Sequence, residues 1–469
     1  MKLHNPTILL LSITSVVGCA TNPIPSTEEI SQAASEIKTR LTTQLTTPSP
    51  DTLLAAKRTQ LPTLYAELPR YESEDDVQQI IANYNDAQAY TSNLADHAQD
   101  SEEKAVLSQY AEDLDYAIKP LREKNGDSMF SLLGGPAYTP EQGALLAGGG
   151  LYSFTTDRND IDLQRSSITG FMMVNFPSNG SMGYGFQSKQ NIFFNQNNSK
   201  YEGVVNFGQQ SSQYFGVGYD KGSTVEMGED TTYDANRGEY IGSLAYRFFG
   251  DWYFGANAEM NYVKVTEQSD YILADQDFQD YADKPFTLGL GLVLEYDSRD
   301  FAVNAKEGLY FKANYLNFNE KIGSDSDYYK ANFEFRSYYS FNPTNTIASF
   351  TQFQATKGDV PFYDLATLGG ANSMRGIFKG QFIDNTAFET TLEWRHTFSR
   401  ANGLPSNHGM TLWSGIGGVG ESLNTLSDDL FVSYGVGYRY QIQPKMNIRL
   451  DLGMSEFGNG FYFNFTEAF

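Results

Sequence analysis

Short segments in which apolar and polar residues alternate run through the chain from Gly143 to its last residue. Alternation with a period of two is typical of β-strands with one buried face, because successive side chains point to opposite sides of a strand. We count about sixteen such segments, a number within the range of closed antiparallel barrels. They lie at 145–156, 165–176, 182–195, 200–209, 213–220, 238–249, 253–266, 286–297, 308–319, 328–341, 346–357, 386–398, 409–418, 430–441, 446–454 and 460–469.

A membrane-spanning barrel fits this pattern. Past the N-terminus no apolar run reaches the ~20 residues that a membrane helix needs, and the mean hydropathy is −0.42. However, 31 Tyr, 33 Phe and 42 Gly are spread over the alternating segments, as in a barrel whose lipid face uses every second residue. The net charge of −24 argues against a nucleic-acid partner. We therefore expect an all-β, antiparallel outer-membrane barrel over residues 136–469, with a small helical segment before it.

The connections between the segments fall into two alternating sets. Residues 177–180, 250–251 and 342–345 form short turns, whereas 221–237, 267–285 and 358–385 are long. A barrel with short periplasmic turns and long outer loops requires this parity. The connection 358–385 is therefore expected on the outer side, where it could fold back into the lumen.

The last two segments show the expected faces of the barrel wall. Asn447, Arg449 and Asp451 should face the interior, and Glu467 is expected at the membrane interface, where an acidic side chain costs little. The residues expected to face lipid are Met446, Ile448, Leu450, Leu452 and Met454 in the first segment, and Phe461, Phe463, Phe465 and Phe469 in the second.

Cys19 is the single cysteine of the chain and ends an apolar run behind Lys2. Residues 16–19 read VVGC, which predicts a lipobox and a lipoprotein signal peptide over residues 1–18. A thioether-linked, palmitate-type diacylglycerol anchor on Cys19 would follow. The alternative is an ordinary secretory signal in which Cys19 is incidental. One cysteine allows no intramolecular disulfide.

Two further regions precede the barrel. Residues 19–50 are rich in Ser, Thr and Pro and predict a flexible tether. Residues 51–126 contain two amphipathic helical patterns, which predict a periplasmic helical hairpin. Its apolar stripe is either the hairpin's own core or a face for a periplasmic partner protein.

Residues 368–382 read LGGANSMRGIFKGQF. This stretch resembles the arginine-glycine loop of the BamA/TamA-type outer-membrane barrels (the bacterial surface antigen family), with Gly369, Gly370, Arg375 and Gly376 at the motif positions and Ile377 in place of an aromatic residue. Residues 294–313 (LEYDSRDFAVNAKEGLYFKA) and 138–154 (YTPEQGALLAGGGLYSF) carry the same resemblance. It covers residues 136–469, within the few residues usual for such limits.

The resemblance implies that Arg375 enters the lumen and is held there by two acids. The family's glutamate on the next strand matches Glu393, but its aspartate on the strand after that falls where this chain has Gly415. Either Glu393 and Glu389 hold the loop between them, or the loop is looser than in the relatives. We expect an Arg375–Glu393 ion pair, because a buried guanidinium needs an anion; the alternative is a solvated loop arginine.

The resemblance also implies a route of assembly. A terminal Phe469, together with Phe463 and Phe465, resembles the signal by which the barrel assembly machinery recognises its clients. Gly148, Gly149 and Gly150 lie in the expected first strand, and glycine weakens a strand. They could form a seam against 460–469 that parts sideways; the alternative is that small residues fill a crowded wall.

The function implied is insertion or translocation of protein, or of lipid, at the bacterial outer membrane, among its lipid and lipopolysaccharide. Residues 51–126 lack the alternation of the periplasmic POTRA repeats that receive clients. A passive or gated pore and a structural docking barrel therefore remain alternatives.

An enzyme is not expected, since His396 and His408 flank a predicted periplasmic turn and no histidine is placed with Ser or Asp at the outer rim. No cofactor or metal is expected either, because the acidic residues of 267–285 lack the spacing of a calcium loop.

Overall fold

The computed structural model describes residues 74–98, parts of 101–111, and 126–469 except 159, 161–162, 301–303, 400–404 and 444–445. The chain divides into two compact units, Met1–Met129 with Phe154–Arg165, and Phe130–Ser153 with Ser166–Phe469. The predicted signal peptide, Cys19 and the predicted tether lie outside the described residues.

Helix α4 (Glu74–His97) is the main described element of the first unit. Ile81, Thr91 and Ala95 are buried along one side of it, and Leu107 and Ala111, in the second predicted helix, are helical and buried too. Most of that second helix lies outside the described residues, so the hairpin remains a prediction. No helix in the described part of the chain is both long enough and apolar enough to cross a membrane.

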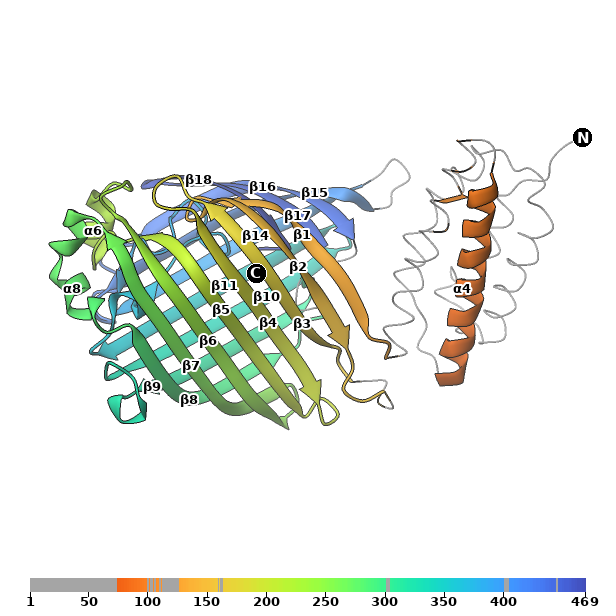
Figure 1. Ribbon diagram of the computed structural model, residues 1–469, viewed down its shortest axis with the longest axis horizontal. Coiled ribbons are helices and arrows are strands. Elements are labelled where there is room, and N and C mark those ends of the chain that lie inside the picture. Colours follow the sequence, from red (N-terminus) through yellow and green to blue (C-terminus); the bar gives the residue numbers. More distant parts are fainter. Residues whose placement is uncertain are drawn as a thin grey trace, which may run out of the picture. The chain divides into compact units, whose positions relative to one another are not determined.

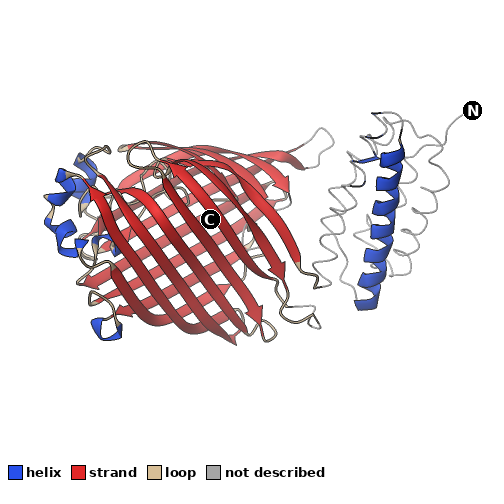
Figure 2. Cartoon of the chain, viewed as in Figure 1, coloured by secondary structure: helices blue, strands red, loops and turns tan. Residues whose placement is uncertain are grey.

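The second unit is a closed antiparallel barrel of 16 strands, as predicted (Figures 1 and 2). Each strand pairs with its neighbours in the chain, and the barrel closes between β1 and β18, where Tyr138 lies opposite Phe463. The strands are β1 (Met129–Thr139), β2 (Gly143–Phe154), β3 (Ser166–Phe176), β4 (Gly183–Phe194), β5 (Ser199–Gln213), β6 (Thr232–Phe249), β7 (Trp252–Gln268), β8 (Phe286–Asp297), β9 (Gly308–Phe318), β10 (Tyr328–Asn342), β11 (Asn345–Gly358), β14 (Thr386–Ser399), β15 (Pro405–Gly420), β16 (Phe431–Gln443), β17 (Met446–Ser455) and β18 (Gly458–Phe465).

The alternation along the strands separates a polar lumen from an apolar outer surface. On β17, Arg449 and Asp451 are fully buried inside, whereas Leu452 is 52% exposed on the outside. The same division on β14 places Glu393 inside and Leu392 outside. On these two strands the outward-facing side chains are apolar, as the lipid face of a membrane barrel requires.

The number of strands was predicted correctly through two errors that cancel. The prediction missed β1, whose sequence MFSLLGGPAYT alternates poorly around its two glycines and proline. It also divided β5 and its following residues into two strands, 200–209 and 213–220. Tyr214 and Phe215, in the second of these segments, are 1% exposed and lie beyond the end of β5.

The predicted glycine seam is wrong, because the prediction took β2 for the first strand of the barrel. Gly148, Gly149 and Gly150 lie on β2, which is one strand away from the closure between β1 and β18. A Cβ on Gly149 would lie 1.9 Å from the Gly170 oxygen on β3, and one on Gly150 would lie 2.6 Å from the Phe130 ring on β1. The alternative interpretation, that small residues fill a crowded wall, therefore fits Gly149 and Gly150.

One predicted turn also belongs to the opposite end of the barrel. A Cβ on Gly180 would lie 2.6 Å from Ser211 and 2.9 Å from Thr232, which flank the long connection 214–231. The turn 177–180 therefore shares the end that carries the long connections, which we call the outer end. The extra predicted strand had shifted the parity of every connection before it.

Short helices gather at the outer end (Figure 1). Three of them, α6, α7 and α8, belong to the two long connections that precede β6 and β8. Phe278 of α8 stacks on Phe362 of the connection after β11, with ring centroids 4.4 Å apart. The short elements are α6 (Tyr219–Thr224), α7 (Asp270–Leu273), α8 (Gln276–Ala282), η1 (Glu320–Ile322), η2 (Phe362–Asp364), β12 (Ala366–Thr367) and β13 (Ile383–Asp384).

The end of the chain turns into the barrel instead of continuing along the lipid face. Strand β18 ends at Phe465, and Thr466 has a left-handed backbone with φ 66°. Phe469 is buried with its ring 5.3 Å from that of Phe350, which faces the lumen. The prediction that Phe469 and Glu467 lie on the lipid face and at the interface is therefore wrong, because the left-handed turn breaks the alternation.

Candidate functional site

The connection between β11 and β14 folds into the lumen. Its two short strands β12 and β13 pair with each other and close the base of a loop, residues 368–382. Apolar side chains of this loop are buried together with three residues of the barrel wall, Ala387, Val419 and Phe431. The loop members of this cluster are Leu368, Met374, Ile377 and Phe382.

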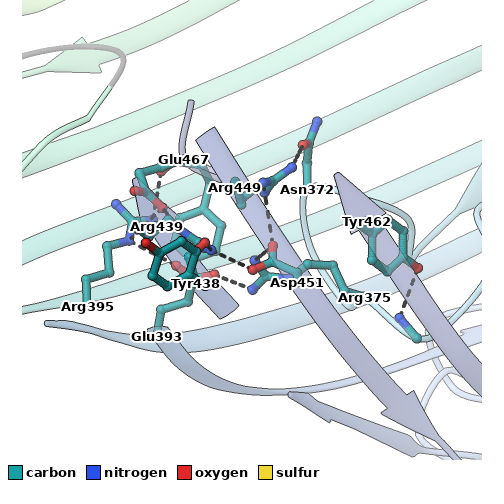
Figure 3. Close-up of polar contacts among 12 residues, drawn as sticks. Asn372, Arg375, Glu393, Arg395, Tyr438, Arg439, Arg449, Asp451, Tyr462 and Glu467 are labelled. Carbon is teal, nitrogen blue, oxygen red and sulfur yellow. Dashed lines mark hydrogen bonds and ion pairs between the residues drawn. The ribbon is translucent and has the colours of Figure 1, made fainter. Parts of the chain in front are cut away.

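Arg375 stands at the inner tip of this loop and has no exposed surface (Figure 3). Its Nη2 donates to Glu393, and its Nη1 donates to Asp451 Oδ2 at 2.9 Å. The guanidinium carbon lies 4.2 Å from the centre of the Trp413 ring, within the range of a cation–π contact. The expected ion pair between Arg375 and Glu393 is therefore present.

Asp451, and not a residue near Gly415, supplies the second acid. A Cβ on Gly415 would lie 2.9 Å from Met374 Cγ, so the loop's own methionine occupies the space of a side chain there. Glu389 accepts a hydrogen bond from the Gly369 backbone N–H at 3.1 Å and holds the loop without contacting the arginine. The proposal that Glu389 shares the arginine is wrong, because the second acid comes from β17. The sequence placed Asp451 inside the barrel but gave no sign that it meets Arg375.

Glycines allow the loop to approach the wall closely. Gly369, Gly370 and Gly376 have φ of 85°, 93° and 100°, in the left-handed region that favours glycine. The Gly376 N–H donates to the Tyr462 hydroxyl of β18 at 3.0 Å. On β17, a Cβ on Gly453 would lie 2.4 Å from the Arg375 carbonyl. The barrel wall therefore packs closely against the backbone of Arg375 and Gly376 as well as against the Arg375 side chain.

The arginine completes a closed ring of alternating charges in the lumen (Figure 3). The chain's end belongs to this ring, since Arg395 donates to the Phe469 main-chain oxygen at 3.0 Å and contacts Glu467 at 3.9 Å. The position of Arg375 is thus linked through ion pairs to the C-terminal residues. The ring runs Arg375, Glu393, Arg395, Glu467, Arg439, Asp451 and back to Arg375, and Arg449 contacts Asp451 from outside it.

A second ion cluster fixes the beginning of the connection. Lys330 of β10 bonds Asp364 of η2 and lies 2.7 Å from Glu259 of β7, while the Tyr328 hydroxyl donates to Asp364. Burial raises the pKa of the Asp364 carboxyl to about 6, although Lys330 opposes this shift. The sequence alone does not reveal this cluster, because its members come from three distant segments.

Gly453→Ala is expected to push the Arg-Gly turn away from the wall. The new methyl group would overlap the Arg375 backbone, and overpacking of this kind costs about 1 to 3 kcal/mol. A Ser373→Cys reporter, at a loop position only 4% exposed, should then react faster with a maleimide in isolated membranes. Gly148→Ala is the matched control, because a Cβ there meets no atom within 4 Å. Equal labelling in the two variants would contradict the close fit.

Comparison with known proteins gives one family. A model of the Omp85 superfamily domain matches residues 154–469. No curated protein sequence matches the chain.

Three solved structures are similar to the chain at low sequence identity. A BamA from Haemophilus ducreyi lacking POTRA domains 1–3 is similar at 13% identity and a TM-score of 0.49, over 72% of this chain and 70% of that one. CdiB from Acinetobacter baumannii is similar at 10% identity and a TM-score of 0.45, over 95% of this chain and 100% of that one. CdiB from Escherichia coli is similar at 9% identity and a TM-score of 0.45, over 72% of this chain and 62% of that one. These three scores lie below 0.5, so the family of the chain follows from the matched domain model alone.

Proposed function

The chain belongs to the Omp85 superfamily, and on this premise we propose that it inserts or translocates protein at the bacterial outer membrane, with Arg375 as a lock on the lumen. By the lock we mean Arg375 together with Glu393 and Asp451. One observation carries the proposal: the lumen contains a loop whose central arginine is fully buried between two acids of the wall.

The lock would give the loop in the lumen a function. A buried arginine is costly unless its charge is paired, and removing one partner of a buried pair costs about 3 to 5 kcal/mol. A passive pore needs no arginine in its lumen, whereas a translocator must close its lumen when no client is present. A loop that is held by ion pairs and hydrogen bonds can be released as a unit once those contacts are exchanged.

The regions around the barrel would serve delivery and assembly. We propose that Cys19 carries a diacylglycerol anchor and that residues 51–126 form a periplasmic hairpin that docks a partner protein. Phe463 and Phe465 face outward on β18, so they are open to recognition by the barrel assembly machinery. Phe469 would be recognised before it turns into the lumen.

Single-channel recording of the wild-type protein in planar bilayers tests the proposal against its alternatives. A lumen closed by the lock gives a mostly silent barrel with rare openings. Steady conductance would indicate a passive pore instead. A silent barrel whose deletion leaves the outer-membrane and secreted proteins of the cell unchanged would favour a structural docking barrel. The proposal requires that some of those proteins decline on deletion and return with the wild-type gene.

A further inference from the structure

Two arginines compete for one oxygen of Asp451. Arg375 Nη1 donates to Oδ2 at 2.9 Å, and Arg449 Nε lies 3.5 Å from the same oxygen (Figure 3). The other oxygen, Oδ1, accepts from Arg439 at 2.6 Å. Arg449 therefore lies beside Asp451 Oδ2, which already accepts a hydrogen bond from Arg375 of the loop.

Arg449 is poorly satisfied where it stands. Its side chain has no exposed surface, yet Nε and Nη1 make no hydrogen bond within the described residues. It also lies directly opposite Arg439 in the register of β16 and β17, and like charges in that position repel. Among the described residues it makes one hydrogen bond, from Nη2 to Asn372 of the loop, which is long at 3.3 Å. A buried guanidinium in this state gains free energy if a carboxylate oxygen becomes available.

Withdrawal of Arg375 makes such an oxygen available. The barrel side contributes three arginines, Arg395, Arg439 and Arg449, which contact Glu393, Asp451 and Glu467. Arg395 also donates to the main-chain oxygen of Phe469. Arg375 adds a fourth guanidinium to this cluster, and its withdrawal removes a positive charge close to Arg449 and leaves Asp451 Oδ2 without its hydrogen-bond donor.

We propose that Arg449 is the replacement cation of the lock: when the loop withdraws Arg375, the Arg449 guanidinium moves onto Asp451 Oδ2 and keeps this carboxylate paired. The inference rests on the proposed lock function. Ordinarily, withdrawal of a buried partner leaves an uncompensated charge behind and is strongly unfavourable. Here the wall supplies its own cation, and repulsion between Arg449 and Arg375 also lowers the cost of opening. Arg449 is a positioning residue that makes the lock reversible.

Labelling of Ser373→Cys by a maleimide measures how often the loop leaves the lumen, and mass spectrometry of the peptide that contains residue 373 separates it from Cys19. Arg449→Gln should slow labelling about tenfold, which corresponds to ~1.4 kcal/mol, because the open state then leaves Asp451 with Arg439 alone. Arg449→Lys keeps the charge and should restore a rate close to the wild type. Asn372→Ala controls for the lost contact with the loop, which by itself should not slow labelling.

Asp451→Asn should accelerate labelling, and in that background Arg449→Gln should no longer slow it, since the two arginines have nothing left to compete for. Heat-modifiable mobility on gels establishes that each barrel is folded. The inference is overturned if Arg449→Gln labels at the wild-type rate or faster while Asp451→Asn and Glu393→Gln still accelerate labelling. If neither acid variant changes the rate, the lock itself is wrong and the role of Arg449 fails with it.

Discussion

Arg375→Ala is expected to convert a mostly closed barrel into one that opens at least about tenfold more often in planar bilayers, which corresponds to ~1.4 kcal/mol or more. The substitution removes both ion pairs of the loop tip and the contact with Trp413. The loop keeps its backbone contacts with Glu389 and Tyr462, so its release should be frequent but not complete.

The barrel itself should survive this substitution. Without Arg375, Glu393 keeps its ion pair with Arg395 and Asp451 keeps its ion pair with Arg439, and Arg449 can bond Asp451. By contrast, Glu393→Gln removes the acid that Arg375 and Arg395 share and leaves each of them with one other acidic side chain, Asp451 or Glu467. Loss of one partner of a buried ion pair costs about 3 to 5 kcal/mol. We therefore expect Glu393→Gln to lower the unfolding temperature more than Arg375→Ala does. Circular dichroism in detergent measures this order.

Arg375→Lys separates charge from shape. A lysine cannot bridge two carboxylates with a planar fork, so this variant should open more often than the wild type but less often than Arg375→Ala. Conductance unchanged in both variants would mean that the arginine does not hold the lumen closed.

The sequence predicted the barrel because period-two alternation is repeated in nearly every strand. It failed where local chemistry interrupts the alternation: at β1, which has two glycines and a proline, and at Thr466, whose left-handed backbone turns Phe469 inward. Aromatic residues lie both on the lipid face and among the buried residues of the outer end, so composition alone could not assign Tyr214 and Phe215.

The site was predicted in part. The Arg-Gly motif and the inward position of Glu393 are local features that a sequence can show. The partnership with Asp451 depends on which strands lie beside the loop tip, and 76 residues separate it from Arg375. Gly415 is informative only in the structure, where Met374 fills the space above it. Pairings between distant inward-facing charges depend on the barrel's closure and the path of the loop, which no single strand encodes.

Lys330→Met is expected to detach the beginning of the connection and to destabilise the barrel by about 3 to 5 kcal/mol, as when one partner of a buried ion pair is lost. Lys330 is 14% exposed and is shared by Glu259 and Asp364, which are 6% and 7% exposed. Methionine keeps the volume of the side chain but leaves two neighbouring carboxylates without their cation. Lys306→Met, at an exposed position, is the matched control.

The stability lost in Lys330→Met should depend on pH, and the direction of this dependence shows whether the charge of Asp364 causes the loss. The pKa of Asp364 is raised to about 6, against about 4 for an ordinary aspartate, so the folded state keeps a proton that the unfolded chain has released. This contribution to stability is present below about pH 4 and is lost as the pH rises through about 6. Removing Lys330 should raise the pKa further, because the opposing cation is gone. The difference in unfolding temperature between Lys330→Met and the wild type should therefore be small at acidic pH and grow above about pH 6.

A second substitution tests whether excess negative charge on Glu259 and Asp364 causes the loss of stability in Lys330→Met. Glu259→Gln in the Lys330→Met background removes one of the two carboxylates and should recover part of the lost stability, because the repulsion on Asp364 disappears. Two sites in direct contact commonly show coupling of about 0.5 to 3 kcal/mol in such a cycle. Strictly additive effects, or a deficit that is the same at every pH, would show that Lys330 acts through packing of its carbon chain. Asp364 would then hold the connection through packing and not through charge. The ion pairs of the lock would be the electrostatic contacts that hold the loop.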